Sequence, residues 1–204
     1  MQRFLKIPVA LAIVFLLMLT QGCASAKKSS HVADLQQMKP GQRVEKFRVT
    51  PGSLTAQTFT KIHLPKIETN GLKEFPKVST ELAALWLTDA MTAEIKKRPG
   101  WGLATAPENA TCILSLAITQ IDPGNRTARI IASELGAGHA FVQVEGKLLS
   151  PSGAELAAFV DRRRNSGAMG FKDTFSDAGP RLIQALIENI SIDAIAELAA
   201  AAAD

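Results

Sequence analysis

The chain has 204 residues, 47% of them hydrophobic, which is enough for one packed domain or a small pair of domains. Its formal charge is +4 at pH 7, and two of its cations, Arg3 and Lys6, belong to the first 22 residues. The remainder therefore carries +2, which is too small an excess to indicate a nucleic acid as the partner.

The first 22 residues predict a signal peptide. Arg3 and Lys6 supply its positive start, and the apolar run Val9–Leu19 follows. This run is too short to span a bilayer comfortably, so it predicts export followed by cleavage rather than a permanent membrane helix.

The residues after the apolar run read LTQGCAS and resemble the lipobox of bacterial lipoproteins, with Thr20 where that pattern usually has Leu. The resemblance implies cleavage before Cys23 and acyl chains such as palmitate on the new N-terminus, which would hold a soluble domain on a membrane. Ala24, where an inner-membrane retention signal would have Asp, favours the outer membrane by the same resemblance. The alternative is cleavage after Ala26, at an A-x-A site, which would release a soluble periplasmic protein.

Lipidation would leave Cys112 as the one free thiol of the mature chain. Cys112 lies in an alternating apolar run, which predicts an inert buried side chain and no disulfide framework.

The segment that follows Cys23 is polar, charged and broken by Pro40-Gly41. Its composition predicts a linker over residues 23–45 and a single folded domain over 46–204. Short strands are expected at 47–49 and 59–64, each followed closely by a turn signal.

A helix is predicted from Ser79, a good N-cap residue, to Lys97, before Pro99-Gly100. It is apolar on two sides, so it needs two partners. Either the sheet and a second helix of this chain cover both stripes, or one stripe meets another protein. The candidate partner-facing residues are Leu87, Met91 and Ile95.

Three strands are expected in the centre of the chain, at 112–119, 139–149 and 156–160. In the first, the even positions carry the larger apolar side chains; in the second, Gln143, Glu145 and Lys147 are expected to face water. Polar-out and apolar-in strands joined by the turn Pro151–Gly153 indicate an antiparallel sheet. Residues 126–134 fit either a short helix or the continuation of a hairpin.

A second helix begins near Asp173, with Pro180 expected in its first turn and an apolar stripe from Leu182 to Leu198. The predicted fold class is therefore α+β, with a mostly antiparallel sheet of about four to five strands packed by two main helices.

The runs AITQIDPGNRTAR and GAGHAFVQVEGKLL, followed by an SG turn and ELAAFVDRR, resemble an uncharacterised family of proteobacterial envelope lipoproteins. The family is known only as a domain of unknown function, and the resemblance covers roughly residues 45–198, most specifically 122–138. It implies an exported, lipidated α+β domain, and it brings no catalytic residues with it.

No residue pattern predicts catalysis, a cofactor or a metal ion. Gly136 and Gly138 introduce a strand rather than a helix and lack the Lys-Ser/Thr of a phosphate-binding loop. The histidines His31, His63 and His139 are far apart and do not form a metal-ligand motif.

Five arginines are the candidate functional side chains: Arg126, Arg129, Arg162, Arg163 and Arg164. Alternation along a strand places Arg162 and Arg164 on one face and Arg163 on the other. One interpretation is a rim paired with Asp122 and Asp161. The other is a contact patch for an anionic ligand or an acidic partner.

The sequence thus favours a non-enzymatic interaction or accessory module on the periplasmic side of a membrane, held by its N-terminal lipid and working with a protein partner of the cell envelope. The alternative is a periplasmic ligand carrier or hydrolase whose site leaves no sequence signature.

Overall fold

The computed structural model describes residues 31–50, 53, 59–69, 72, 79–122, 140–165 and 171–201. Its strands are β1 (Lys46–Val49), β2 (Ile62–His63), β3 (Leu103–Ala104), β4 (Cys112–Asp122), β5 (Ala140–Leu149) and β6 (Glu155–Asn165). Its α-helices are α2 (Thr80–Lys97) and α4 (Phe171–Ala201), and two 3-10 turns are η2 (Leu35–Gln37) and η3 (Pro107–Asn109). The fold class is α+β with two main helices, which confirms the coarse prediction.

The strands form one mixed sheet in the order β1-β6-β5-β4-β2-β3. Strands β1, β6, β5 and β4 are neighbours in this order and pair antiparallel. Strand β2 is parallel to both β3 and β4. The prediction of four to five mostly antiparallel strands therefore missed a parallel edge. This edge arises because α2 is the crossover between β2 and β3, and a crossover connection brings its two strands together in the same direction.

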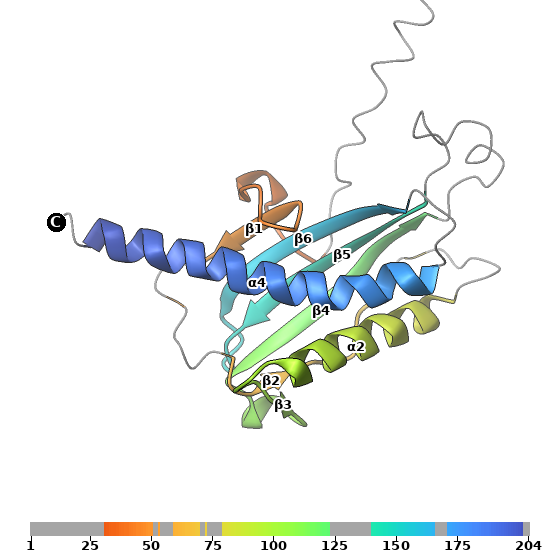
Figure 1. The fold of residues 1–204 in the computed structure, drawn as a ribbon, viewed down its shortest axis with the longest axis horizontal. Helices are drawn as coiled ribbons and strands as arrows, with labels where there is room; N and C mark the ends of the chain where they lie inside the picture. The colour runs from red at the N-terminus through yellow and green to blue at the C-terminus, as the bar shows by residue number, and fades with distance from the viewer. Residues whose placement is uncertain are drawn as a thin grey trace, which may run out of the picture.

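Both helices cover one face of the sheet and lie against each other (Figure 1). Helix α2 begins where predicted, because the Ser79 hydroxyl accepts a hydrogen bond from the Leu82 N–H at 3.2 Å. The two helices approach closely at Gly179, where an added Cβ would lie 2.6 Å from the Ala90 carbonyl. Helix α4 starts at Phe171, so Pro180 is inside the helix rather than in its first turn.

Strand β4 contains a bulge that changes which residues face the helices. The register shifts between Ile118 and Gln120, so that Ile118 and Ile121, three positions apart, both belong to the core beneath the helices. Thr119 and Gln120 consequently lie on the other face, because a bulge places two residues opposite one on the neighbouring strand.

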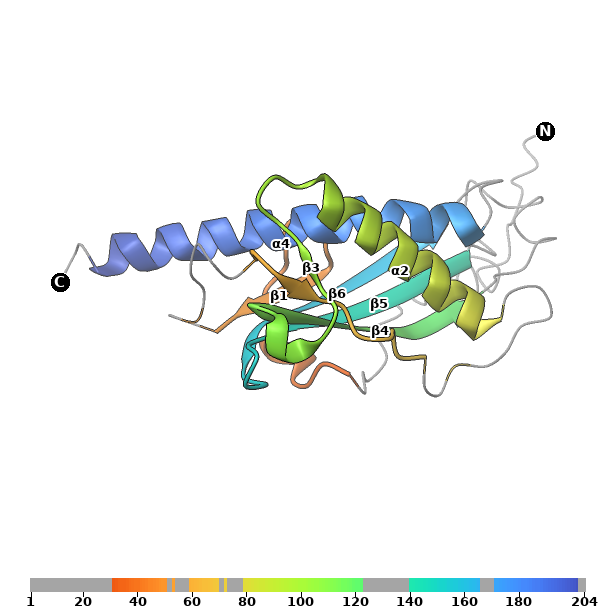
Figure 2. The same cartoon turned by 90° about the horizontal axis from the view of Figure 1, so that it is seen from below.

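The opposite face of the sheet is crossed by the N-terminal strap, which we define as residues 31–45 (Figure 2). Val32 and Met38 are buried against Ala158 and Val160 of β6. Residues 31–45, the last 15 of the segment expected to be a linker, therefore lie along the folded domain. Four large apolar side chains in an otherwise polar segment, Val32, Leu35, Met38 and Val44, were too weak a pattern to indicate this packing.

Within the described part of the chain, neither helix is long and apolar enough to cross a bilayer.

Candidate functional site

The arginine run of β6 is divided between the two faces of the sheet, as alternation predicted. Arg163 lies on the helix-covered face, where it contacts Asp161 of the same strand. Arg162 lies on the strap side, with its guanidinium carbon 4.4 Å from the centre of the Phe141 ring. Arg164 belongs to β6, but its side chain is outside the described part of the chain, as are Arg126 and Arg129. The structure therefore does not bring the five arginines into one described patch.

Asp161 is a buried carboxylate that receives two guanidinium groups. Its side chain is 3% exposed, with Arg163 Nε 3.1 Å from Oδ1 and Arg181 Nη2 2.6 Å from Oδ2. A second donor, Arg181 Nε, lies 3.2 Å from Oδ2. Because Arg181 belongs to α4 and Asp161 to β6, this ion pair joins the helix layer to the sheet. Of the rim interpretation, the structure shows the pairing of the arginine run with Asp161, through Arg163.

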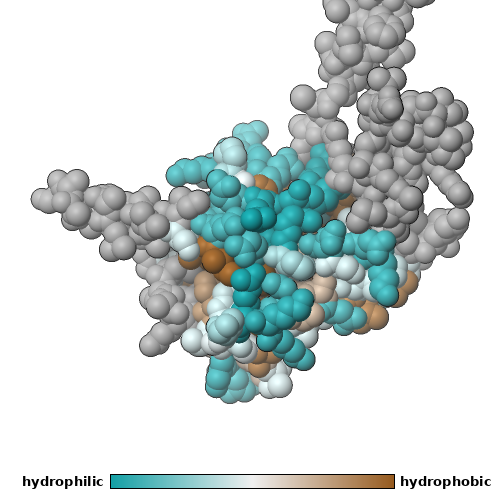
Figure 3. All heavy atoms as spheres, in the orientation of Figure 1, coloured by the Kyte–Doolittle hydropathy of each residue, from teal (hydrophilic) through white to brown (hydrophobic). Residues whose placement is uncertain are grey.

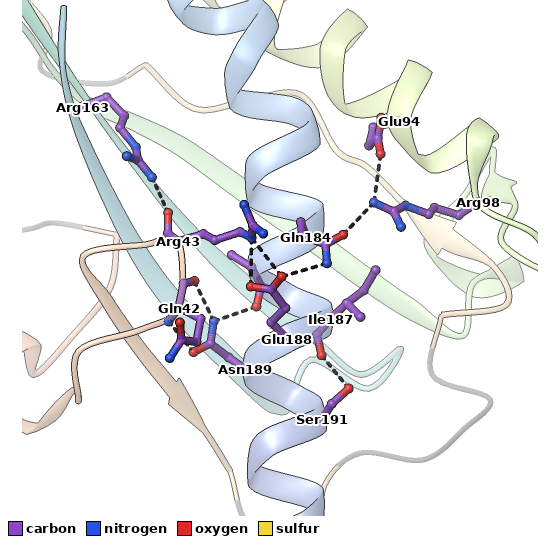
Figure 4. Close-up of polar contacts among 11 residues, drawn as sticks. Gln42, Arg43, Glu94, Arg98, Arg163, Gln184, Ile187, Glu188, Asn189 and Ser191 are labelled. Carbon is purple, nitrogen blue, oxygen red and sulfur yellow. Dashed lines mark hydrogen bonds and ion pairs between the residues drawn. The ribbon is translucent and has the colours of Figure 1, made fainter.

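A second group of polar contacts, the Arg43 network, fastens the strap to α4 and β6 (Figure 4). It consists of Gln42, Arg43, Arg163, Glu188 and Asn189. The Asn189 amide donates to the Gln42 carbonyl at 3.0 Å and accepts from the Gln42 N–H at 2.8 Å. Arg43 Nε donates to both Glu188 carboxylate oxygens at 2.9 Å. The Arg43 carbonyl in turn accepts a hydrogen bond from Arg163.

Arg43 occupies an uncommon backbone conformation within this network. Its φ is +61°, in the left-handed region that a residue with a Cβ seldom adopts. A strained residue persists only where its surroundings fix it. Here, both its carbonyl and its side chain are bonded to distant elements, and these bonds hold the strap in its turn.

The Arg43 network continues across α4 to the C-terminal end of α2 (Figure 4). Gln184 donates to Glu188 at 2.9 Å and accepts from Arg98 at 3.0 Å, and Arg98 also donates to Glu94 at 3.0 Å. The hydrogen bond from Gln184, followed by that from Arg43, lowers the pKa of the Glu188 carboxyl. These bonds therefore favour folding above the ordinary glutamate pKa, and this contribution is lost as the pH falls through the lowered value.

These contacts position structural elements, and the chemistry they offer is hydrogen bonding and charge pairing. Together they connect the strap, β6, α4 and α2. In the described ranges, no group of three or more His, Cys, Asp or Glu side chains could hold a metal ion.

The stripe of α2 that was a candidate for facing a protein partner is instead buried inside the domain. Leu87, Met91 and Ile95 are each 0% exposed, because the sheet and α4 enclose them. The exposed large apolar residues of the described chain are instead Leu82 and Leu85, at 37% and 54%. The helix-covered side is mostly hydrophilic, with small separate apolar patches (Figure 3).

The strap side contains buried polar residues that the sequence analysis placed in water. Gln143 and Glu145 are 2% and 0% exposed, respectively. Glu145 accepts hydrogen bonds from Thr119 at 2.7 Å, from Gln143 at 2.8 Å and from the Val32 N–H at 3.2 Å. Strand alternation identified their face correctly, but it could not show that the strap covers that face.

The two described histidines, His31 and His63, make ordinary local contacts. His31 Nδ1 lies 3.5 Å from a Glu68 carboxylate oxygen, and His31 Nε2 lies 3.4 Å from the Ser115 carbonyl. His63 Nδ1 lies 3.2 Å from the Ala104 carbonyl. His139 lies outside the described residues.

Cys112 is a buried free thiol at the start of β4, as predicted. Burial raises the pKa of this thiol to about 12. We therefore expect it to resist alkylating reagents in the folded protein at pH 8 and to react fully after unfolding in urea, which mass spectrometry of the labelled chain would detect. Rapid labelling of the native protein would contradict its burial.

Comparison with solved structures gives only distant likenesses. PelC from Paraburkholderia phytofirmans, solved as a dodecamer, is 17% identical, with a TM-score of 0.47 over 66% of this chain and 95% of that one. A variant of the same protein is 19% identical, with a TM-score of 0.43 over 66% and 96%. A PDZ domain protein from Parabacteroides distasonis is 10% identical, with a TM-score of 0.40 over 66% and 33%.

No curated protein matches the sequence. A family model described as "Domain of unknown function (DUF4410)" matches residues 44–170, which include all six strands and all of helix α2.

Proposed function

This chain belongs to the DUF4410 family, a domain of unknown function, and we propose that it is a non-enzymatic accessory module held on the periplasmic side of the outer membrane by a lipid on Cys23. The proposal combines the lipobox-like LTQGCAS run with the place where the folded domain begins. A protein partner in the cell envelope completes this role.

The observation that carries the proposal is the small number of residues between Cys23 and the strap. His31 already contacts Ser115 and Glu68, so only eight residue steps separate it from Cys23. Eight extended residues reach at most about 28 Å, because each step spans no more than about 3.5 Å. A lipidated chain would therefore keep its domain close to the membrane surface rather than let it reach across the periplasm.

The strap is also firmly fixed to the domain, so the lipid would hold the whole sheet and not a loose tail. Val32 is buried and its N–H bonds to Glu145 of β5. Lys39 and Phe47 exchange two backbone hydrogen bonds, of 3.1 and 2.8 Å. The Arg43 network then fixes the last part of the strap to α4.

We expect Cys23→Ser to abolish incorporation of labelled palmitate and to move the protein from the membrane fraction to the soluble fraction. Cys112→Ala, which changes the other cysteine, is the matched control and should leave both properties unchanged. Mass spectrometry of the mature N-terminus gives the direct readout. A free N-terminus at Lys27 would instead establish cleavage after Ala26 and a soluble periplasmic protein.

The accessory role is tested separately, by crosslinking the full-length protein in intact membranes and comparing wild type with Cys23→Ser. The proposal expects a defined crosslinked protein whose yield falls when the lipid is absent. Turnover of an envelope substrate by the purified protein would favour the hydrolase alternative, and a small molecule retained through purification would favour the ligand carrier.

A further inference from the structure

The two layers of the domain differ in charge. Helices α2 and α4 together contain eight acidic and four basic residues, whereas the six strands contain six basic and four acidic residues. The helix layer is therefore net negative and the sheet is net positive. An uneven distribution of this kind orients a protein in the field of a charged surface.

Several of the basic strand residues project from the sheet face that the helices do not cover. Register pairs Lys46 with Val160, and both Arg48 and Lys147 with Ala158, so these cations share the face on which the strap packs. Arg162 contacts Phe141 on the same face. Arg48 is neutralised by Glu155 at 2.6 Å, Lys46 Nζ donates one hydrogen bond to the Leu35 carbonyl at 2.7 Å, and the acidic Glu145 is buried.

The first described residues of the chain, which are nearest in sequence to Cys23, lie on this same face. His31 contacts Ser115 of β4 and Val32 contacts Glu145 of β5, and Val32 packs with Ala158 and Val160 on the side opposite to the helices. Because a tether that reaches at most about 28 Å starts on this face, the lipid would draw this face of the sheet nearest to the membrane.

From the tether and the charge distribution together we infer that the strap-covered face of the sheet lies against the membrane, with Lys46, Lys147 and Arg162 directed toward anionic phospholipid headgroups. This inference rests on the proposed lipid anchor and adds an orientation to it. The helix layer, with its acidic surface, then faces away from the membrane and toward the periplasm. Attraction between basic side chains and anionic lipid acts within a few ångströms of the surface, the range that a short tether enforces.

The orientation can be measured with one fluorescent label on each layer of the lipidated, full-length protein. Gln36→Cys places the label on η2 of the strap, and Ala93→Cys, the matched control, places it on the exposed side of α2. Neither Cys23, which carries the lipid, nor the buried Cys112 should react. The protein is bound to phosphatidylcholine vesicles with or without phosphatidylglycerol, which contain a headgroup-attached energy acceptor.

We expect stronger energy transfer from position 36 than from position 93, and a larger difference when phosphatidylglycerol is present. The difference should shrink between about 0.01 M and about 1 M salt, as the screening length falls from about 30 Å to about 3 Å. Combined Lys46→Gln and Lys147→Gln substitutions should remove the effect of phosphatidylglycerol while the protein stays on the vesicles. Equal transfer from the two labels, or stronger transfer from position 93, would overturn the orientation.

The same experiment separates this inference from the proposed anchor. If the full-length protein does not stay with vesicles at all, the lipid anchor fails. If it stays on the vesicles but the two labels report equal distances, the anchor holds and the orientation is wrong.

Discussion

Gly146→Val is expected to lower the free energy of unfolding by about 3 kcal/mol, because it overpacks the core between the sheet and the helices. A Cβ at position 146 would collide with Cε1 and Cζ of Phe159, which lies directly opposite on β6, and would come 2.9 Å from Leu116 Cδ2. Both neighbours are 1% exposed, so neither can move toward solvent. The aromatic ring fills the space over the glycine, and urea unfolding followed by tryptophan fluorescence would measure the loss.

The matched control is Gly102→Ala, where the nearest atom to an added Cβ is the Thr60 carbonyl at an ordinary 3.4 Å. Its effect should stay within about 0.5 kcal/mol. Combining Gly146→Ala with Phe159→Leu should cost less than the sum of the two single substitutions, because the smaller side chain releases the space that the new methyl group needs. Additive losses would show that Phe159 is not the obstacle.

Local patterns were sufficient for the elements that the sequence analysis predicted well. The even positions of β4 face the core as far as Ile118, and the hairpin between β5 and β6 turns at Gly153, whose φ is +88°. Ser79 caps α2 where expected. In each case, the residues that determine the element lie within a few positions of one another, so a single sequence contains the needed information.

The features that were missed depend on segments far apart in the chain. Glu145 looks like a water-facing strand residue, and only the packing of Val32 over it, 113 positions away in sequence, makes it buried. A strand was expected over residues 59–64, which contain β2, but its parallel pairing with β3 was missed, because this pairing follows from the crossover through α2. The Thr119 bulge has no local signal apart from the three-residue spacing between Ile118 and Ile121.

The candidate site divides in the same way. Arg163 and Asp161 were recognised because they are neighbours on one strand. Arg181 and Arg43, which complete their contacts, come from α4 and from a segment that was predicted to be a linker. The two stripes of α2 were also recognised, but periodicity alone could not tell which stripe the rest of the chain would cover.

Asp161→Asn should produce the second large loss of stability, about 3 kcal/mol, because removing one partner of a buried ion pair leaves charge without compensation. Two guanidinium groups would then face a neutral side chain at the junction of β6 and α4. The loss of unfolding free energy should lie near the lower end of the range for broken buried ion pairs. This is because Arg163 is 40% exposed and its guanidinium can turn toward water. Urea unfolding of wild type and variant would measure it.

Glu155→Gln provides the control, because the Arg48–Glu155 pair has the same 2.6 Å separation as Arg181–Asp161 but both of its side chains are 28% exposed. Water already stabilises charges at such a position, so the loss should be about 1 kcal/mol or less, and salt should reduce it further. If the two substitutions cost the same, burial of Asp161 would not be what makes its ion pair important. A larger loss for Asp161→Asn would instead show that the contact between β6 and α4 depends on a charge removed from solvent.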